Sequence, residues 1–371
     1  MPNLKLWWRS IDRLTLGIVF TLLSLSIMLI TTTSSVVADR ISASPNYFII
    51  KQFYYIAVGI TIIIALSFFS HISVRRISII LFFLFLLLLM AVPFIGFAMK
   101  GAKRWIYIAG VSIQPSELIK PFFIITTAWL INIKDNKLYS ITTTFLLYLM
   151  VAFCLLMQPD FGMLLIISGI LTTQLFVAGI PLILVLISTA VACVSLIIAY
   201  FTIPYVSQRI DSFFLEKASY QISKALLAFQ SGGMWGKGPG EGVIKKSLPD
   251  SHTDFIFAVA SEELGGIGGV LIISLFAFLI IYNLYMLKSI DDKFKLLAIV
   301  GLLSQIAIQS IINIAVNLYL IPTKGTTLPL ISYGGSSLIS MCAAVGILLS
   351  LSRTDFSISN YKLNVNKHII L

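Results

Sequence analysis

Residues 77–99 read ISIILFFLFLLLLMAVPFIGFAM, a run of 23 residues without a charged side chain. A helix needs about 20 apolar residues to cross the hydrocarbon core of a bilayer, so this stretch predicts a membrane span. The rest of the chain has the same character. Of its 371 residues, 58% are hydrophobic and 11% are charged, whereas an average soluble domain has about 25% charged residues. This composition excludes soluble enzymes and secreted scaffolds and predicts an integral membrane protein.

The uncharged runs predict about ten spans. The longest run, Phe161–Gln208, is divided in two by Gly179-Ile180-Pro181, because proline ends a helix. Pro115–Ile133 is a further span, although it carries Glu117 and Lys120 near its start. The remaining runs each have the length of one crossing: Leu14–Ala38, Gln52–Ser70, Ile77–Met99, Leu138–Pro159, Leu264–Leu287, Leu296–Thr323 and Gly325–Ser352. The predicted fold is an all-α polytopic bundle that forms a single membrane domain over residues 1–371.

The distribution of basic residues predicts the orientation of this bundle. With ten spans, the two tails, residues 1–13 and 353–371, share a side, and that side carries 13 Lys and Arg residues. The opposite side also carries 13, but six of them lie in the long segment Pro204–Glu263, which counts weakly in the positive-inside rule. We therefore expect both tails in the cytoplasm and a large extracytoplasmic loop, residues 204–263, between spans 7 and 8.

This predicted loop is the first place to look for chemistry, because long loops in compact domains are usually functional. Ile222, Leu226 and Phe229 have helical spacing and predict a short amphipathic helix on the membrane surface. Further along, His252-Thr253-Asp254 and Glu262-Glu263 bring carboxylates to the outer membrane interface. One carboxylate can act as a general base toward a sugar hydroxyl, whereas a retaining hydrolase needs two that face each other. The spacing leaves both arrangements open.

Glu117, Lys120 and Asp160 are further candidates, because polar groups at membrane depth are costly unless they are paired. Each has a structural alternative. Glu117 and Lys120 are three residues apart and can neutralise each other at a helix start. Asp160 can be an acid favoured by the dipole at a helix N-terminus, and the spacing alone favours that interpretation.

Lys103 and Arg104, followed by Trp105, fall on the predicted outer face, where the positive-inside rule gives no reason for cations. Two explanations fit these residues equally well: the cations bind an anionic lipid head group, or they anchor the chain at an aromatic membrane interface. His252 has no second histidine at ligand spacing, so we predict no metal site built from protein ligands. A divalent cation bridged by carboxylates and a pyrophosphate stays open. The basic residues are scattered between the spans, which argues against nucleic acid as a partner.

Four motifs, at residues 101–105 with 114–117, at 158–160, at 248–255 and at 322–337, resemble those of the SEDS family, the shape, elongation, division and sporulation proteins of the bacterial envelope. The motifs occur in the family's order between Leu14 and Arg353. The motif at 322–337 and the segment Gly238-Pro239-Gly240-Glu241-Gly242 look more like the division branch of the family than its elongation branch. The four are Gly101-Ala102-Lys103-Arg104-Trp105 with Gln114-Pro115-Ser116-Glu117, then Gln158-Pro159-Asp160, LPDSHTDF at 248–255, and PTKGTTLPLISYGGSS at 322–337.

The resemblance implies a peptidoglycan glycosyltransferase that polymerises lipid II at the outer face of the bacterial inner membrane, at the division septum. It also implies a class B penicillin-binding protein as partner transpeptidase, together with other division proteins. By motif match, Asp254 is the expected catalytic base. The expected substrate-binding residues lie in or near the motifs: Lys103, Arg104, Trp105, Glu117, Lys120, Asp160, His252, Thr253, Glu262, Lys324, Ser332 and Ser336.

Two other function classes are compatible with ten spans, a lipid II flippase and a non-catalytic division scaffold. A transporter would place ionisable groups near the bilayer midplane. In this sequence they gather at the predicted outer ends of spans, which favours surface chemistry over transport.

Overall fold

The computed structural model describes residues 4–99, 102–108, 110–133, 137–180 and 219–353, together with isolated positions between 183 and 213. Most of the described chain is helical. Several helices, α2, α4, α7, α10 and α12, begin after an Asp or Ser whose side chain accepts a hydrogen bond from the first turn. The α-helices are α1 (Leu4–Ser10), α2 (Arg13–Arg40), α3 (Tyr47–Phe68), α4 (His71–Ile95), α5 (Pro115–Ile131), α6 (Lys137–Met157), α7 (Phe161–Val177), α10 (Tyr220–Gly232), α11 (Ile256–Met286), α12 (Lys293–Asn317) and α13 (Gly335–Leu351), and the 3-10 turns are η1 (Ile244–Lys246) and η2 (Leu287–Ser289).

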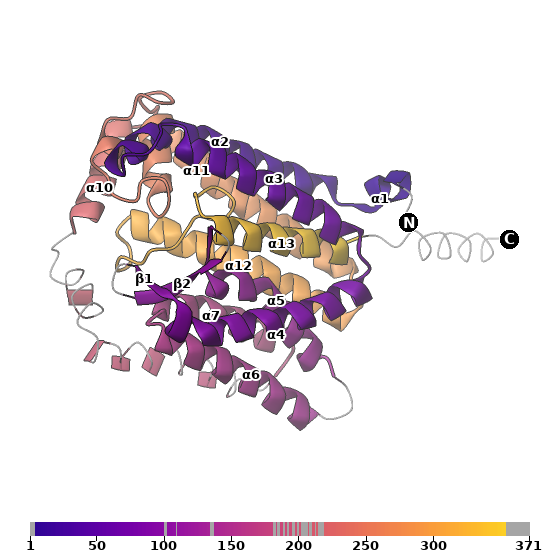
Figure 1. The fold of residues 1–371 in the computed structure, drawn as a ribbon. Helices are drawn as coiled ribbons and strands as arrows, with labels where there is room; N and C mark the ends of the chain where they lie inside the picture. The colour runs from indigo at the N-terminus through magenta and orange to yellow at the C-terminus, as the bar shows by residue number, and fades with distance from the viewer. Residues whose placement is uncertain are drawn as a thin grey trace.

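The helices form a bundle whose centre is occupied by α5, α12 and α13 (Figure 1). Helices α2, α3 and α11 cover one side of this centre, and α4, α6 and α7 cover the other. The central α5 and α13 are only 17 residues long and are buried along almost their whole length. They are sheltered from lipid by the longer helices around them.

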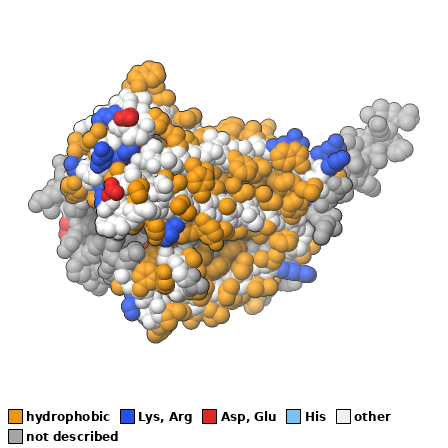
Figure 2. Space-filling model, turned by 45° about the horizontal axis from the view of Figure 1, so that its top comes forward, with side chains coloured by type: hydrophobic (Ala, Val, Ile, Leu, Met, Phe, Trp, Pro, Cys, Tyr) orange, Lys and Arg blue, Asp and Glu red, His pale blue; other side chains and the backbone are white. Residues whose placement is uncertain are grey.

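Six helices of the described chain are long and apolar enough to cross a membrane: α2, α3, α4, α6, α11 extended through η2, and α12. Most of these long helices expose large hydrophobic side chains, among them Ile50, Leu87, Phe94, Ile281 and Ile311. Figure 2 shows a broad band of hydrophobic side chains between two ends that carry Lys and Arg. Such an apolar band is the surface expected of a bundle embedded in lipid.

Small residues let the central helix α13 approach its neighbour α3 closely. A methyl group on Gly59 would lie 2.6 Å from the sulfur of Cys342, and one on Gly346 would lie 3.0 Å from the Cα of Ile63. Close backbone approach of this kind is typical of helix packing in membranes.

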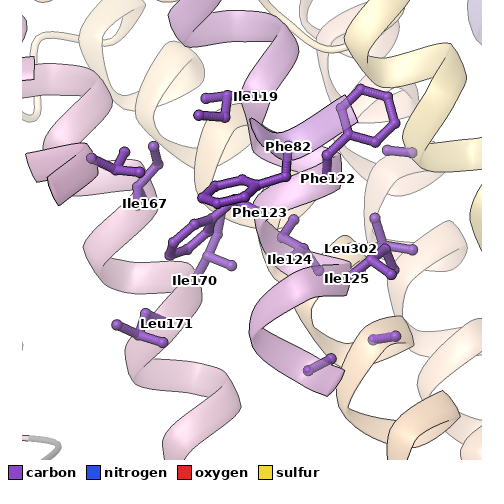
Figure 3. Close-up of a cluster of buried hydrophobic side chains, with 14 of the residues drawn as sticks. Phe82, Ile119, Phe122, Phe123, Ile124, Ile125, Ile167, Ile170, Leu171 and Leu302 are labelled. Atoms are coloured by element: carbon purple, nitrogen blue, oxygen red, sulfur yellow. The ribbon is translucent and has the colours of Figure 1, made fainter. Parts of the chain in front are cut away.

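Aromatic and aliphatic side chains from α4, α5 and α7 form part of the buried interior of the bundle. Phe82 of α4 packs beside Phe123 of α5, with ring centroids 6.1 Å apart, and Phe122 stacks on Phe85 at 5.5 Å. Ile167 and Ile170 of α7 complete this core (Figure 3). These residues belong to one buried cluster that joins α4, α5 and α7.

A small antiparallel sheet follows α4 and was not predicted by the all-α assignment. Strand β2 (Ala102–Ile108) pairs on one edge with β1 (Phe97–Met99) and on the other with β3 (Val111–Ile113). The predicted span Ile77–Met99 therefore ends early, with α4 finishing at Ile95. The segment 97–113 contains Lys100, Lys103 and Arg104, so it has no apolar run long enough for a further span.

Three other predicted boundaries differ from the structure. Helix α11 begins at Ile256, eight residues before the predicted span start at Leu264, so Glu262 and Glu263 lie inside a helix. Helix α12 ends at Asn317 and α13 begins at Gly335, so most of the motif at 322–337 lies in the connection between these helices. The proposed second half of the run 161–208 lies largely outside the described residues. The predicted amphipathic helix is α10.

The two described ends of the chain meet at the C-terminal end of α3. The indole nitrogen of Trp7 donates to the hydroxyl of Ser67 at 3.1 Å, and Arg353 donates to the carbonyl oxygens of Ser67 and Phe68 at 3.2 Å. The sheet and α10 lie at the opposite end of the bundle (Figure 1). The fold thus separates the two described ends from the end that carries the motifs.

Candidate active site

The motifs at the sheet end converge on one group of charged side chains, which we call the charged cluster: Arg104, Glu117, Lys120, Asp160 and Lys324. They come from β2, the first two turns of α5, the start of α7 and the connection between α12 and α13. Four segments far apart in sequence therefore build one site.

Arg104 connects the sheet to the start of α7. Its guanidinium lies 3.9 Å from the carboxylate of Asp160 and donates to the carbonyl oxygens of Gln158 and Pro159. Asp160 is mostly buried, caps α7 by accepting from the amide of Met163 at 3.3 Å, and lies 3.5 Å from the Ser116 hydroxyl. Asp160 therefore has the structural role that the sequence suggested, an acid at a helix N-terminus, and it is also a member of the charged cluster.

Glu117 and Lys120 form the expected pair, with 2.6 Å between the ammonium nitrogen and a carboxylate oxygen. Lys120 is fully buried and also donates to the side-chain oxygen of Gln309 on α12 at 2.7 Å. The pair is therefore more than a local neutralisation at a helix start, because it ties α5 to the centre of the bundle.

Lys324 completes the charged cluster. Its ammonium nitrogen is buried and has no hydrogen-bond partner among the described residues. Burial lowers the pKa of Lys324 to about 8; the carboxylates of Asp160 and Glu117 act in the opposite direction, and Lys120 and Arg104 add to the lowering. An unpartnered ammonium group surrounded in this way is suited to meet an anion supplied from outside the protein.

Asp254 lies beside this cluster, on the far side of Gly325. A methyl group on Gly325 would lie 2.8 Å from a carboxylate oxygen of Asp254, so the acid packs directly against the residue that follows Lys324. Asp254 is partly exposed. The candidate base therefore lies against the segment that carries Lys324.

Helix α12 contributes residues that the sequence analysis missed. Asn313 donates to the carbonyl oxygens of Asp254 and Thr326 at 2.9 and 2.5 Å, and Asn317 donates to that of Asp254 at 3.0 Å. Gln309 donates to Thr327 and accepts from Lys120. A signal was present, because amide residues recur every fourth position at 305, 309, 313 and 317 of an otherwise apolar helix.

Several predicted substrate-binding residues hold the connecting segments together. The Ser332 hydroxyl donates to the carbonyl of Thr253 at 2.6 Å and accepts from the amide of Leu328. The Ser336 hydroxyl accepts from the amide of Gln114 at 3.0 Å. The His252 ring packs 4.7 Å from Phe48, measured between centroids. The Ser332 bond joins the segment 248–255 to the motif at 322–337, and the other two contacts tie these segments to the start of α5 and to α3.

Lys103, Trp105 and Glu262 are not brought into the charged cluster. Successive side chains of β2 alternate between faces, so Lys103 and Trp105 lie opposite Arg104. Lys103 is exposed. The carboxylate of Glu262 is fully buried and accepts from the backbone amides of residues 243, 244 and 245 at 2.7, 2.7 and 3.1 Å. Glu262 therefore caps η1, which explains how an acid can lie inside α11.

The arrangement can do two kinds of chemistry. Three cations and two carboxylates share the charged cluster, so an anionic group that enters it meets excess positive charge. A partly exposed carboxylate next to it can accept a proton. Within the described residues, no group of three His, Cys, Asp or Glu side chains is placed to hold a metal ion.

Comparisons with known proteins place the chain among cell-envelope proteins. A family model described as "Cell cycle protein" and named for FtsW, RodA and SpoVE matches residues 12–356. A protein of Caulobacter vibrioides called "Probable peptidoglycan glycosyltransferase FtsW" is 37% identical over 355 residues, which cover 94% of this chain and 91% of that protein. A protein of the same name from Coxiella burnetii is 34% identical over 348 residues, covering 90% and 93%.

Solved structures share the fold. The Thermus thermophilus rod shape determining protein RodA superposes with a TM-score of 0.70 at 25% identity, covering 93% of this chain and 97% of that one. A chain from a structure described as the structural coordination of polymerization and crosslinking by a peptidoglycan synthase complex superposes with a TM-score of 0.76 at 24% identity, covering 92% and 98%.

Proposed function

Because the chain belongs to the FtsW/RodA/SpoVE family, we propose that it is a peptidoglycan glycosyltransferase that polymerises lipid II into glycan strands. The observation that carries this proposal is the placement of Asp254 against Gly325, the residue that follows Lys324 of the charged cluster. A base and a cation in this relation match the two needs of glycosyl transfer from a lipid pyrophosphate.

In the proposed reaction, Asp254 accepts the proton of the acceptor sugar hydroxyl as that oxygen attacks the anomeric carbon of the donor. The bond from this carbon to the pyrophosphate oxygen breaks, and undecaprenyl pyrophosphate leaves with the bonding electron pair. Lys324 and Arg104 stabilise the negative charge that develops on the leaving group. Asp160 and the Glu117–Lys120 pair keep these cations in position.

The fold supports a substrate that stays in the membrane. Outside the cytoplasm no nucleotide sugar is available, so a sugar polymerised there carries its own leaving group. The apolar flanks of the bundle can hold a polyprenyl tail while the pyrophosphate reaches the charged cluster and the acceptor sugar reaches Asp254. On this basis Asp254 is the proposed base, Arg104 and Lys324 bind the pyrophosphate, and Asp160, Glu117 and Lys120 keep these two cations in position.

We further propose that the protein acts at the division septum with a class B penicillin-binding protein as the transpeptidase and with other division proteins. The FtsW names of its relatives and its fold similarity to a chain of a peptidoglycan synthase complex support this assignment. The direct experiment is polymerisation of purified lipid II by the purified protein, with and without the partner. Transfer of lipid II across vesicles without polymer formation would instead identify a flippase, and neither activity would leave a scaffold.

The proposed topology has ten spans, cytoplasmic tails and the segment 204–263 mainly outside. It is supported by the 13-to-7 basic asymmetry and by the common end at which Trp7 and Arg353 lie. Reporter fusions at Asn3 and Asn366 should report the cytoplasm, and a fusion at Gly240 the outside. A cytoplasmic signal at Gly240 would overturn both the orientation and the placement of the reaction.

A further inference from the structure

Asp254 lies in a short turn whose two ends are fixed by hydrophobic residues. Leu248, just before the turn, and Phe255, at its end, are both buried in one hydrophobic cluster. The same cluster contains Ile222 of α10 and Val316 of α12. The turn that carries the proposed base is therefore anchored to a cluster in which α10 takes part.

Within this turn, the backbone carbonyl of Asp250 accepts three hydrogen bonds. The donors are the amides of Thr253 and Phe255, at 3.1 and 3.2 Å, and the Thr253 hydroxyl at 3.3 Å. Asp254 lies between these two donor residues in the sequence. The backbone of Asp250 therefore fixes the part of the turn that presents the carboxylate of Asp254.

Asp250 adopts a backbone conformation that few residue types accept. Its φ is 53°, in the left-handed region, where aspartate and asparagine are enriched among the residues other than glycine. Its carboxylate accepts a hydrogen bond from the side-chain amide of Gln221, on α10, at 3.2 Å. This bond connects the residue that organises the turn directly to α10.

The chain just before the turn is held by α2. Arg40, the last residue of α2, donates to the carbonyl oxygens of Lys246 and Leu248 at 2.6 and 3.1 Å. These bonds fix the entry to the turn, whereas the bond from Gln221 acts on the turn itself. A change at Gln221 should therefore alter the turn without releasing the segment that leads into it.

We propose that Gln221 and Asp250 are positioning residues for the proposed base. The bond between their side chains holds the backbone of Asp250 in the conformation from which Asp254 reaches the acceptor hydroxyl, and neither residue contacts the substrate. The inference rests on the proposed function, because it concerns the placement of the base in that reaction. A misplacement of about 1 Å can lower a rate about 100-fold, so one bond at this turn affects kcat.

The first measurement is polymerisation of lipid II by the purified full-length protein with its partner transpeptidase. Gln221→Ala should lower kcat about 5- to 20-fold and leave KM for lipid II near the wild-type value, because the base moves and the charged cluster does not. The matched control is Gln230→Ala, at an exposed glutamine of the same helix, which should react as the wild type does.

Two substitutions of Asp250 separate its side-chain bond from its backbone conformation. Glycine accepts a positive φ but removes the acceptor, so Asp250→Gly should be at least as slow as Gln221→Ala. Asparagine keeps an acceptor oxygen and tolerates the left-handed region, so Asp250→Asn should keep most of the rate that Asp250→Gly loses. The double variant Gln221→Ala with Asp250→Gly should be no slower than Asp250→Gly alone, because both changes break the same bond.

A wild-type kcat in Gln221→Ala, a rise in KM alone, or a double variant slowed by the product of the two single losses would contradict the proposal. Amide hydrogen exchange over residues 249–255 tests the same bond without any activity. Exchange should be at least about fivefold faster in Gln221→Ala and unchanged in Gln230→Ala. If the wild type makes no polymer, the proposed function fails, and equal exchange in the wild type and Gln221→Ala would separately show that Gln221 does not hold the turn.

Discussion

The side chain of Lys324 crosses the first turn of α7 directly over Gly162. A methyl group on Gly162 would lie 1.4 Å from Cε of Lys324 and 2.3 Å from its ammonium nitrogen. The absence of a side chain at residue 162 therefore creates the path by which this lysine reaches Asp160. The helix itself would accept alanine at residue 162, but the side chain of Lys324, 162 positions away in the sequence, leaves no room for the methyl group.

Replacing Gly162 with alanine should displace Lys324 while the fold survives. Alanine favours a helix over glycine by about 0.5–1 kcal/mol, and the displaced atoms belong to the flexible end of a side chain. A displacement of the ammonium group by about 1 Å or more should lower polymerisation roughly 10- to 100-fold. Gly169→Ala is the control in the same helix, because its methyl group would meet a terminal methyl of Ile308. Equal activity of the two variants would show that the position of Lys324 does not matter.

Removing the two cations that face the proposed pyrophosphate should weaken the binding of lipid II. A charge-assisted hydrogen bond contributes about 1.5–3 kcal/mol, so Arg104→Ala combined with Lys324→Ala should lower the apparent affinity at least tenfold. The control pair is Lys237→Ala with Lys246→Ala, two exposed cations. An unchanged affinity in the first pair would identify Arg104 and Lys324 as structural residues.

The lowered pKa of Lys324 predicts a pH dependence of lipid II binding. The pKa is about 8, so the ammonium group is charged below this pH and loses its proton as the pH rises through it. Affinity for the anionic substrate should therefore be highest below pH 8 and fall between about pH 8 and 9.5. Lys324→Arg should not show this fall, because arginine stays charged throughout this range. A parallel fall in both proteins would assign the dependence to another group.

Asn313 should position Asp254 without contacting the substrate. It donates to the backbone carbonyls of Asp254 and Thr326, which links the base to the segment that carries Lys324. In Asn313→Asp the carboxylate cannot donate these bonds, so kcat should fall about 10- to 100-fold while KM for lipid II stays near the wild-type value. Asn283→Asp, at an equally buried asparagine of α11, controls for placing an acid in the bundle. A rise in KM alone would argue against positioning.

Long apolar runs and contiguous motifs are local signals, so the sequence predicted the membrane class, the family, and ten of the helices that the structure describes: nine in predicted spans and the amphipathic helix α10. It did not predict the sheet, which depends on pairing between strands. Glu262 was expected at a site because a carboxylate at the outer membrane interface is costly unless it is paired, yet three backbone amides pair with it, and such partners are visible only in the fold.

The contacts within the charged cluster could not be predicted from the sequence either. All five of its residues were predicted individually. Lys324 passes over Gly162, which lies more than a hundred positions away in the sequence. Asn313 donates to the carbonyl oxygens of Asp254 and Thr326, which lie 59 and 13 positions away. Spacing along the chain carries no information on such contacts. The amide residues of α12 recur at every fourth position, so a search for periodic polar residues within apolar spans would have found them.

The central claim is that Asp254 is the base of a glycosyltransferase, and Asp254→Asn tests it most directly. Asparagine nearly equals aspartate in shape and leaves the backbone carbonyl bonded to Asn313 and Asn317, so the fold should survive. A general base contributes roughly 10²- to 10⁴-fold to the rate. With purified protein, partner transpeptidase and lipid II, Asp254→Asn should polymerise slower by about that factor while still binding lipid II. Asp292→Asn, at the cap of α12, should keep wild-type activity. Full polymerisation by a well-folded Asp254→Asn protein would contradict the account.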